Sequence, residues 1–374
     1  MQHNKNTIWL IIIGSALLHG LIIYLSIPFT NYDLNSWRIG GESVLKGINI
    51  YPIVALRNLP FLPLFLYLEA FALIISSKIF TQIIILKIIF SFFNLCVIYL
   101  IYLLSKKNAY MTALYAFNPV SLLVTCFHGQ FDSLPVFLIL LCIYLIQKRR
   151  KTIPLLILSF AITLKTWPVL FCIPLFRLMK TKFTIRYIIS SLTLLSIFPI
   201  LCTAFYTFFF HANPLLIAKV VISYGGVVTI WGLSKGLFLL IGKNKILFFV
   251  LKLLFVVILF VFQIRNKEKS VFSQIYFAMV LFFVITTGFG IQYFYWIIPF
   301  ALLSKKFSWY VYGAIFCTIV ATYLSFMGVY ISPLISESIP LFTWAVLTIY
   351  FLINIRSYNT KHLLRSFSLF NTKR

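Results

Sequence analysis

The chain has 374 residues, of which 62% are hydrophobic and only 10% are charged, and its mean hydropathy is +1.02. Soluble domains are about half apolar and about a quarter charged, so this composition excludes an ordinary soluble protein. Many apolar runs approach the roughly 20 residues with which a helix crosses the hydrocarbon core. The runs do not alternate in segments of about ten residues, as the strands of a membrane barrel do. We therefore expect an all-α polytopic membrane protein.

The formal net charge is +26, which on a soluble protein would indicate nucleic-acid binding. Here the Lys and Arg residues form short clusters between apolar runs, a pattern typical of the cytoplasmic loops of membrane proteins. We therefore expect a lipid bilayer and no nucleic acid as partner, with both termini cytoplasmic. The six cysteines lie inside apolar segments without CxxC spacing, so they predict neither disulfides nor a metal site.

The first apolar run, residues 8–28, predicts an uncleaved helix rather than a signal peptide, because no small-x-small cleavage site follows it. The longest polar interval of the chain, residues 31–60, comes next and is expected outside the membrane as a loop. Residues 61–78 are interrupted by proline near their start and carry two charges, so we expect a helix that lies along the outer surface. Together these stretches form a predicted first outer loop with an interfacial helix at 29–79.

A single crossing at 80–104 leaves the basic loop at 105–108 in the cytoplasm, whereas two crossings before this loop would place it outside. The run 154–176 lies between basic clusters, so we expect two short helices that meet at Lys165–Pro168. Irregular backbone at that depth must be buried or line a wet cavity. The other expected helices are 109–126, 133–147, 186–210, 246–264, 271–288, 291–303, 308–331 and 338–355, with an outer loop and a partly inserted segment at 211–243.

This count gives about 12 membrane segments, including the two short ones, in one integral membrane domain over residues 1–374. A basic cytoplasmic tail is expected at 357–374. The unusual polar residues fall on the expected outer face, where ionisable groups near a membrane mark a functional site by default. They are Asp33, Glu42, His128, Gln130, Asp132, Lys165, Tyr224, Gln292 and Tyr293.

Five short motifs follow one another along the chain. They are Tyr32-Asp33 after the first helix, the stretch Gly47–Pro52, Asn118-Pro119 leading to HGQFD, Leu164–Pro168, and Gln292–Trp296 before Pro299. In this order they resemble the GT-C class of membrane glycosyltransferases, which use a polyprenyl-phosphate sugar. The most similar patterns are those of the dolichyl-phosphate mannose and glucose transferases and their bacterial counterparts.

The resemblance implies inverting transfer of a hexose, mannose or glucose, from a polyprenyl-phosphate-sugar donor to a lipid-linked or glycan acceptor. It also implies a GT-C-like bundle with an acidic catalytic residue in the first outer loop, a role that falls on Asp33. Many members carry two closely spaced acids there, whereas this chain has Asp33-Leu34-Asn35. A divalent metal is therefore not supported as a cofactor, and no cofactor is expected.

The chemistry agrees with the residue types. An inverting transfer needs one base to deprotonate the acceptor hydroxyl, and Asp33 is the candidate. The leaving phosphate is anionic, so Lys165, Arg38 or Arg57 could stabilise it. The residues expected to bind substrate are Arg38, Glu42, His128, Gln130, Asp132, Lys165, Tyr224, Gln292, Tyr293 and Trp296.

Structural roles compete with each of these assignments. Asp33 could be an ordinary loop acid or a helix cap, and Asp132 could cap the helix that begins at Ser133. Lys165 could extend its charge to the membrane surface from a short helix. Tyr293 and Trp296 could belong to an aromatic belt at the interface.

Three functional classes remain open at this point. The first is the glycosyltransferase, with its active site on the outer or lumenal side of a bacterial plasma membrane or an endoplasmic reticulum membrane. The second is a transporter or lipid flippase for a glycolipid precursor, which would usually show internal repeats and polar residues at the bilayer midplane. The third is a non-catalytic assembly subunit.

Overall fold

The computed structural model describes residues 5–52, 61–179, 184–223, 231–242, 245–266 and 268–371. Every regular element in these ranges is a helix, so the expected all-α class is confirmed for them. The chain divides into two compact units. The first takes the described residues within Met1–Tyr224, Glu268–Phe272 and Gln292–Lys306, and the second takes those within Gly225–Lys267, Ser273–Ile291 and Phe307–Arg374.

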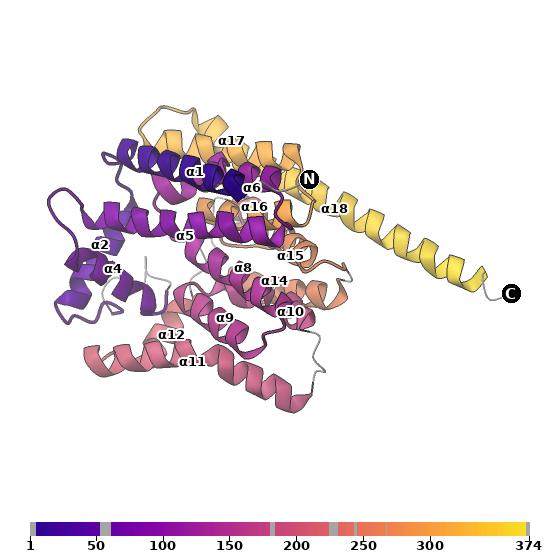
Figure 1. The fold of residues 1–374 in the computed structure, drawn as a ribbon, viewed down its shortest axis with the longest axis horizontal. Helices are drawn as coiled ribbons and strands as arrows, with labels where there is room; N and C mark the ends of the chain where they lie inside the picture. The colour runs from indigo at the N-terminus through magenta and orange to yellow at the C-terminus, as the bar shows by residue number, and fades with distance from the viewer. Residues whose placement is uncertain are drawn as a thin grey trace. The chain divides into compact units, whose positions relative to one another are not determined.

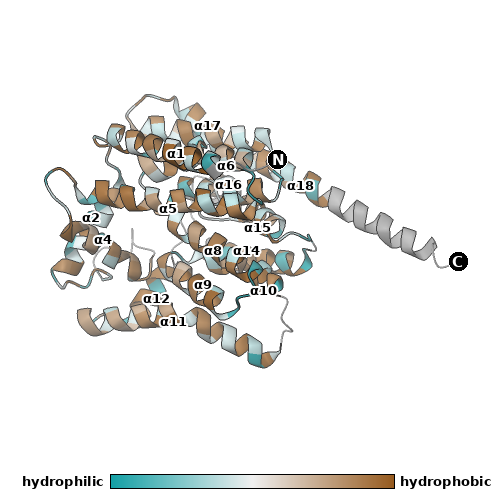
Figure 2. Cartoon of the chain, in the orientation of Figure 1, coloured by the Kyte–Doolittle hydropathy of each residue, from teal (hydrophilic) through white to brown (hydrophobic). Residues whose placement is uncertain are grey.

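Five helices of the described residues are long and apolar enough to cross a membrane, and a sixth is added if one bent pair counts as a single span. The five are α1 (Lys5–Leu25), α5 (Gln82–Leu104), α11 (Ile185–Phe210), α17 (Trp309–Phe326) and α18 (Pro333–Asn371). Within α18 the candidate span is Pro333–Ile355. Figure 2 shows that hydrophobic residues predominate along α1, α5 and α11. These helices support an integral membrane protein, but the expected count of about 12 segments is not confirmed.

The first unit is a row of packed helices. Helix α1 contacts α5, α5 contacts α8, α8 contacts α9, and α9 contacts α11, and Figure 1 shows them in this order. The two helices not yet bounded are α8 (Ser133–Gln147) and α9 (Thr152–Leu164). The unit also contains α10 (Cys172–Leu178), α12 (Pro214–Ser223) and α16 (Phe294–Leu303).

The polar interval after α1 is partly helical, which corrects the expected loop. Helix α2 (Tyr32–Leu45) begins because the Asn31 side chain accepts a hydrogen bond of 2.9 Å from the backbone N–H of Leu34. It packs against α4 (Leu64–Ile74). The contact is close because Gly41 has no Cβ, which would lie 2.9 Å from the backbone of Glu69.

Helix α4 covers only part of the expected 61–78 segment. Its 11 residues measure about 16 Å at 1.5 Å per residue, roughly half of the hydrocarbon thickness. The helix is therefore too short to cross alone, as we predicted. Its position along the membrane surface stays a prediction.

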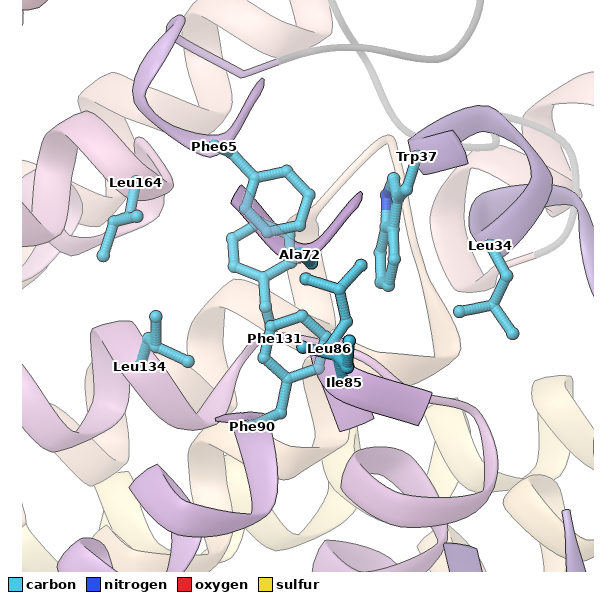
Figure 3. Packing of buried hydrophobic residues seen from close by; sticks show 10 residues of the cluster. All are labelled: Leu34, Trp37, Phe65, Ala72, Ile85, Leu86, Phe90, Phe131, Leu134 and Leu164. Carbon is cyan, nitrogen blue, oxygen red and sulfur yellow. The ribbon is translucent and has the colours of Figure 1, made fainter. Parts of the chain in front are cut away.

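A cluster of aromatic rings fixes the inner face of α2 (Figure 3). Trp37 lies edge-on to Phe65 of α4 and Phe90 of α5, with ring centroids 5.3 and 5.8 Å apart. Phe131 stacks on Phe65 at 3.9 Å. Aromatic pairs of this kind add to the stabilisation that burial provides. They hold α2 in one rotation, and this rotation decides which way Asp33 points.

The expected helix 109–126 is wrong as a single element, because α6 (Ala109–Ala116) ends before Asn118. The Asn118 side chain accepts hydrogen bonds from the N–H groups of Val120 and Ser121 and starts a new helix with Pro119 as its first residue. That helix, α7 (Pro119–Leu122), continues as a π-helix over Leu123–Phe127. The bend between α6 and the helical segment Pro119–Phe127 is 44°.

The predicted break at Lys165 is present. Helix α9 ends at Leu164, Lys165 has extended backbone angles, and a 3-10 turn over Trp167–Phe171 leads into α10. The C-terminal part differs from expectation in its boundaries. Helix α17 ends at Phe326 rather than residue 331, and α18 begins at Pro333 rather than residue 338.

The second unit contains α13 (Gly232–Ile241), α14 (Lys245–Arg265), most of α15 (Val271–Ile285), α17 and α18. Helices α17 and α18 pack together, with the hydroxyls of Thr318 and Thr343 2.7 Å apart. Trp231 and Trp344 donate their indole N–H groups to the last carbonyls of α15, at 2.8 and 2.9 Å. These bonds satisfy helix-end carbonyls that have no partner within the helix.

Candidate functional site

Four segments that are distant in the chain meet in the first unit. They are the start of α2, residues 128–132 before α8, Lys165 after α9, and the 3-10 turn Ile291–Tyr293 that leads into α16. The Asn31 side chain donates a hydrogen bond of 3.1 Å to the carbonyl of His128. This bond holds the start of α2 against the second segment.

Asp33 contacts two side chains of the HGQFD motif. Gln130 Nε2 donates to Asp33 Oδ2 at 2.6 Å. His128 Nε2 lies 3.7 Å from the same oxygen and 3.3 Å from Gln130 Nε2. The Asp33 side chain is 40% exposed, so a ligand can reach its carboxylate. Asp33 does not cap α2, because Asn31 has that role.

Burial raises the pKa of Asp33 above the ordinary carboxyl range, while the Gln130 hydrogen bond and the Lys165 charge oppose this effect. The partial exposure of the carboxylate moderates the effect of burial. Burial lowers the pKa of His128 to about 3, helped by the charges of Lys87 and Lys165. His128 is therefore neutral at pH 7, and its contact with Asp33 is not an ion pair. A carboxylate with a raised pKa is a stronger proton acceptor than an ordinary one.

Asp132 and Lys165 form a buried ion pair, with Lys165 Nζ 2.8 Å from Asp132 Oδ1. The indole N–H of Trp296 donates to the same oxygen. Both side chains are buried, the lysine at 8% exposure and the aspartate at 0%. The Asp132 side chain makes no capping hydrogen bond to α8, so the capping alternative is wrong. The alternative that Lys165 extends its charge to the membrane surface is wrong as well.

Aromatic rings surround this ion pair. Lys165 Nζ lies 4.7 Å from the ring centre of Phe131, and 5.7 and 5.8 Å from those of Trp296 and Tyr293. Trp296 stacks on Trp167, with ring centroids 4.2 Å apart, and on Tyr293, with ring centroids 4.3 Å apart. We call these three rings the aromatic stack. Trp296 is 2% exposed and therefore belongs to the protein interior rather than to an interfacial belt.

Several predicted substrate-binding residues lie elsewhere. Arg38 and Lys46 pair with Glu42 on the exposed surface of α2, at 3.6 and 3.8 Å. At about 100° per residue, Glu42 lies on the side of α2 opposite Asp33. Gln292 is half-buried beside Tyr293. Arg57 and Tyr224 lie outside the described residues.

Sequence reasoning missed two residues that shape the site. Trp167 belongs to the Leu164–Pro168 motif but was not singled out. Lys87 is buried in α5 and donates to the Ser26 hydroxyl at 2.8 Å and to the Phe127 carbonyl at 2.9 Å. A lone lysine inside a long apolar run was the available signal.

The turn at Gly129 needs glycine. Gly129 has φ +80°, and a Cβ there would lie 2.9 Å from Lys87 Cε.

A buried polar network holds α16 in place. Asn94 Oδ1 accepts from the hydroxyls of Tyr115 at 2.8 Å and Tyr295 at 2.7 Å. Asn94 Nδ2 lies 2.8 Å from His19 Nε2, and Ser15 donates to the carbonyl of Ala116 at 3.1 Å. The network joins α1, α5, α6 and α16. It positions Trp296, the next residue after Tyr295.

A metal site is not formed by the described residues, in which no three His, Cys, Asp or Glu side chains lie close enough together to hold an ion. Residues 124–225 match the family model described as Mannosyltransferase (PIG-M). This segment is GT-C-like. The match supports a glycosyltransferase as the class of enzyme, and nothing in it favours a transporter or flippase. No curated protein sequence matches the chain.

The matched GT-C-like segment contains the His128–Asp132 motif and Lys165. Asp33, Tyr293 and Trp296 lie outside it but contact it directly. The segment with the family match therefore supplies part of the cluster, and more distant segments supply the rest.

Proposed function

We propose that the chain is an inverting glycosyltransferase that transfers a hexose, mannose first, from a polyprenyl-phosphate donor to a lipid-linked or glycan acceptor. The observation that carries the proposal is the hydrogen bond between Gln130, inside the mannosyltransferase-like segment, and the exposed carboxylate of Asp33. It gives the matched segment a reachable base. The placement of the site on the outer side, with both termini cytoplasmic, belongs to the same proposal and is supported by the basic clusters.

In the proposed reaction the Asp33 carboxylate accepts the proton of the acceptor hydroxyl. The acceptor oxygen then forms a bond to the anomeric carbon from the face opposite the phosphate. The bond between this carbon and the phosphate oxygen breaks, and the leaving polyprenyl phosphate keeps the electron pair. Gln130 and His128 both approach Oδ2 of Asp33, so they orient the carboxylate, and the Asp33 side chain is still 40% exposed.

The leaving phosphate needs a positive partner, and Lys165 is a buried cation that lies among the aromatic rings of the cluster. An ammonium has three N–H donors, and Asp132 accepts from one of them. Lys165 can therefore keep its ion pair and still donate to a phosphate oxygen. Arg38 and Glu42 remain as candidates only for the outer edge of the donor site, because they lie on the exposed surface of α2.

The test is an assay of the purified protein in lipid nanodiscs with polyprenyl-phosphate mannose, glucose and arabinose as donors. Each donor is combined with lipid-linked and glycan acceptors, and the anomeric configuration of the product is read by NMR. We expect transfer from the mannose donor with inversion. Absence of transfer from all three donors, or a product of retained configuration, contradicts the proposal.

A further inference from the structure

Lys87 is a buried cation of the first unit that the proposed reaction does not use. It lies on α5 at 1% exposure, and it forms no ion pair with an acidic residue in the part of the chain that the structure describes. Its Nζ donates to two neutral oxygens, the Ser26 hydroxyl at 2.8 Å and the Phe127 carbonyl at 2.9 Å. A buried charge without a counter-ion is costly, so in a membrane helix it indicates a functional role.

The two acceptors of Lys87 lie at the end of the helical segment Pro119–Phe127. The carbonyl of Phe127 belongs to the last residue of this segment, and such carbonyls have no partner within the helix. A positive charge is favourable there, because the carbonyl end of a helix carries negative partial charge. The Ser26 hydroxyl also lies 3.3 Å from the carbonyl of Cys126. Lys87 and Ser26 therefore contact the last two carbonyls of the segment.

Gly129 connects Lys87 to the start of α2. A Cβ at this position would lie 2.9 Å from Lys87 Cε and 3.2 Å from Leu34 Cδ2. The backbone of Gly129 therefore packs directly on the lysine side chain and on a residue in the first turn of α2. Because these contacts fix Gly129, the positions of its two neighbours in the chain, His128 and Gln130, depend on Lys87.

His128 and Gln130 both approach the carboxylate of Asp33. Gln130 Nε2 donates to Asp33 Oδ2 at 2.6 Å, and His128 Nε2 lies 3.7 Å from this oxygen. Burial lowers the pKa of His128 to about 3, and the charge of Lys87 adds to this effect. A protonated His128 would form an ion pair with Asp33 and make the carboxylate a weaker base. A cation at position 87 is therefore better suited to a base at Asp33 than a neutral donor would be.

We propose that Lys87 is a positioning residue, which holds the turn at residues 127–130 so that Gln130 orients the Asp33 carboxylate. This role rests on the glycosyltransferase function proposed above, in which Asp33 is the base. Lys87 acts through the turn and contacts neither the donor nor the acceptor. Its loss should therefore lower turnover without weakening donor binding, and the effect should depend on the presence of Gln130.

A double-mutant cycle between Lys87 and Gln130 tests this role. Lys87→Met removes the charge and the donors but keeps a long side chain, and we expect it to lower kcat with the mannose donor about tenfold while the donor KM stays within about twofold. In the Gln130→Leu background we expect Lys87→Met to lower kcat by less than about threefold, because the contact that Lys87 positions is already lost. Equal losses of kcat in the two backgrounds would overturn the proposal. So would a change in the donor KM alone.

The matched control is Lys106→Met, the same substitution at an exposed lysine that follows α5. It should keep the wild-type kcat and KM. If the wild type transfers no hexose from any donor, the proposed function fails and the catalytic role of Lys87 fails with it. If the wild type is active and the two losses are equal, only the role of Lys87 fails.

Hydrogen exchange measured by mass spectrometry tests the turn without any activity. The backbone N–H groups of His128 and Gln130 donate to the carbonyls of Leu123 and Val124, at 2.8 and 3.0 Å. In Lys87→Met we expect the peptide that covers residues 124–132 to exchange about tenfold faster than in the wild type, because the turn opens more often. Lys106→Met should leave this rate unchanged. An unchanged rate in Lys87→Met would contradict a role of Lys87 in holding the turn.

Ser26→Ala covers the case in which Lys87→Met does not fold. It removes one acceptor of Lys87 and leaves the lysine in place. We expect kcat to fall about threefold in the wild-type background and to stay unchanged in the Gln130→Leu background. An equal loss in both backgrounds would overturn the proposal for this variant as well.

Discussion

Gln130 donates a hydrogen bond of 2.6 Å to Asp33 across 97 positions of the chain. The bond joins the start of α2 to the segment that matches the mannosyltransferases. The Asp33 side chain is 40% exposed, so an acceptor can reach its carboxylate. In the proposed reaction Asp33 accepts the proton, and the hydrogen bond from Gln130 orients its carboxylate and lowers its pKa.

The first prediction concerns the base. Asp33→Asn should lower turnover by about 10² or more, the usual scale for losing a positioned base. The fold should persist, because Asn31 rather than Asp33 caps α2. The measurement is kcat with the mannose donor at equal folded yield, with Glu337→Gln, at an exposed acid of α18, as control. Near-normal turnover of Asp33→Asn would remove Asp33 from this role.

The second prediction concerns Gln130. Its hydrogen bond lowers the pKa of Asp33, which burial otherwise raises. Gln130→Leu should therefore raise this pKa further. Because the base acts only when ionised, the acid limb of the kcat/KM profile should move to higher pH. A profile that keeps its shape while the overall rate falls would show that Gln130 is merely structural.

The third prediction concerns the buried ion pair. Lys165→Met should leave Asp132 as an uncompensated buried charge and destabilise the protein by about 3–5 kcal/mol. Lys165→Met combined with Asp132→Leu should recover part of the thermal stability, since neither charge then remains. The stability of the single and of the double variant is measured as the melting temperature in detergent. Recovery by the double variant would separate the folding role of the pair from its role toward phosphate.

The fourth prediction concerns Glu69 of α4, which is fully buried against Gly40 of α2. Among the described residues, neither of its carboxyl oxygens has a hydrogen-bond partner. Burial raises its pKa well above the ordinary value. The unfolded chain then ionises first as pH rises, so stability falls from the ordinary carboxyl range up to the raised pKa of the folded state. Glu69→Gln should remove this part of the pH dependence. The measurement is the melting temperature of the wild type and of Glu69→Gln at each pH from 4 to 8. If the melting temperatures of both proteins change equally with pH, the prediction is wrong.

The fifth prediction concerns sidedness. In a cysteine-free background, a membrane-impermeant thiol reagent should label Ser43→Cys from outside and should not label Ser304→Cys until the membrane is opened. The reason is that basic clusters are retained in the cytoplasm, and Ser304 precedes Lys305 and Lys306. The reverse labelling pattern would place the Asp33 site on the cytoplasmic side.

Local composition was sufficient for the class of protein and for much of the candidate site. Long apolar runs predict membrane helices because the hydrocarbon core demands them, whatever the neighbouring segments are. The break at Lys165 could be predicted because basic clusters on both sides of a short run exclude a single crossing. Asp33, His128, Asp132 and Lys165 stood out because ionisable groups are rare in such a chain.

Only the tertiary structure decided which of these groups meet. Asp132 and Trp296 are 164 positions apart, and no local pattern predicts the contact between them. The rotation of α2 is set by packing of Trp37 and by the close approach at Gly41, and it turns Glu42 and Arg38 away from Asp33. Residue type and spacing act within a few residues, whereas partners across the bundle depend on helix rotation and packing. A sequence without its fold therefore identifies candidate residues but not their partners.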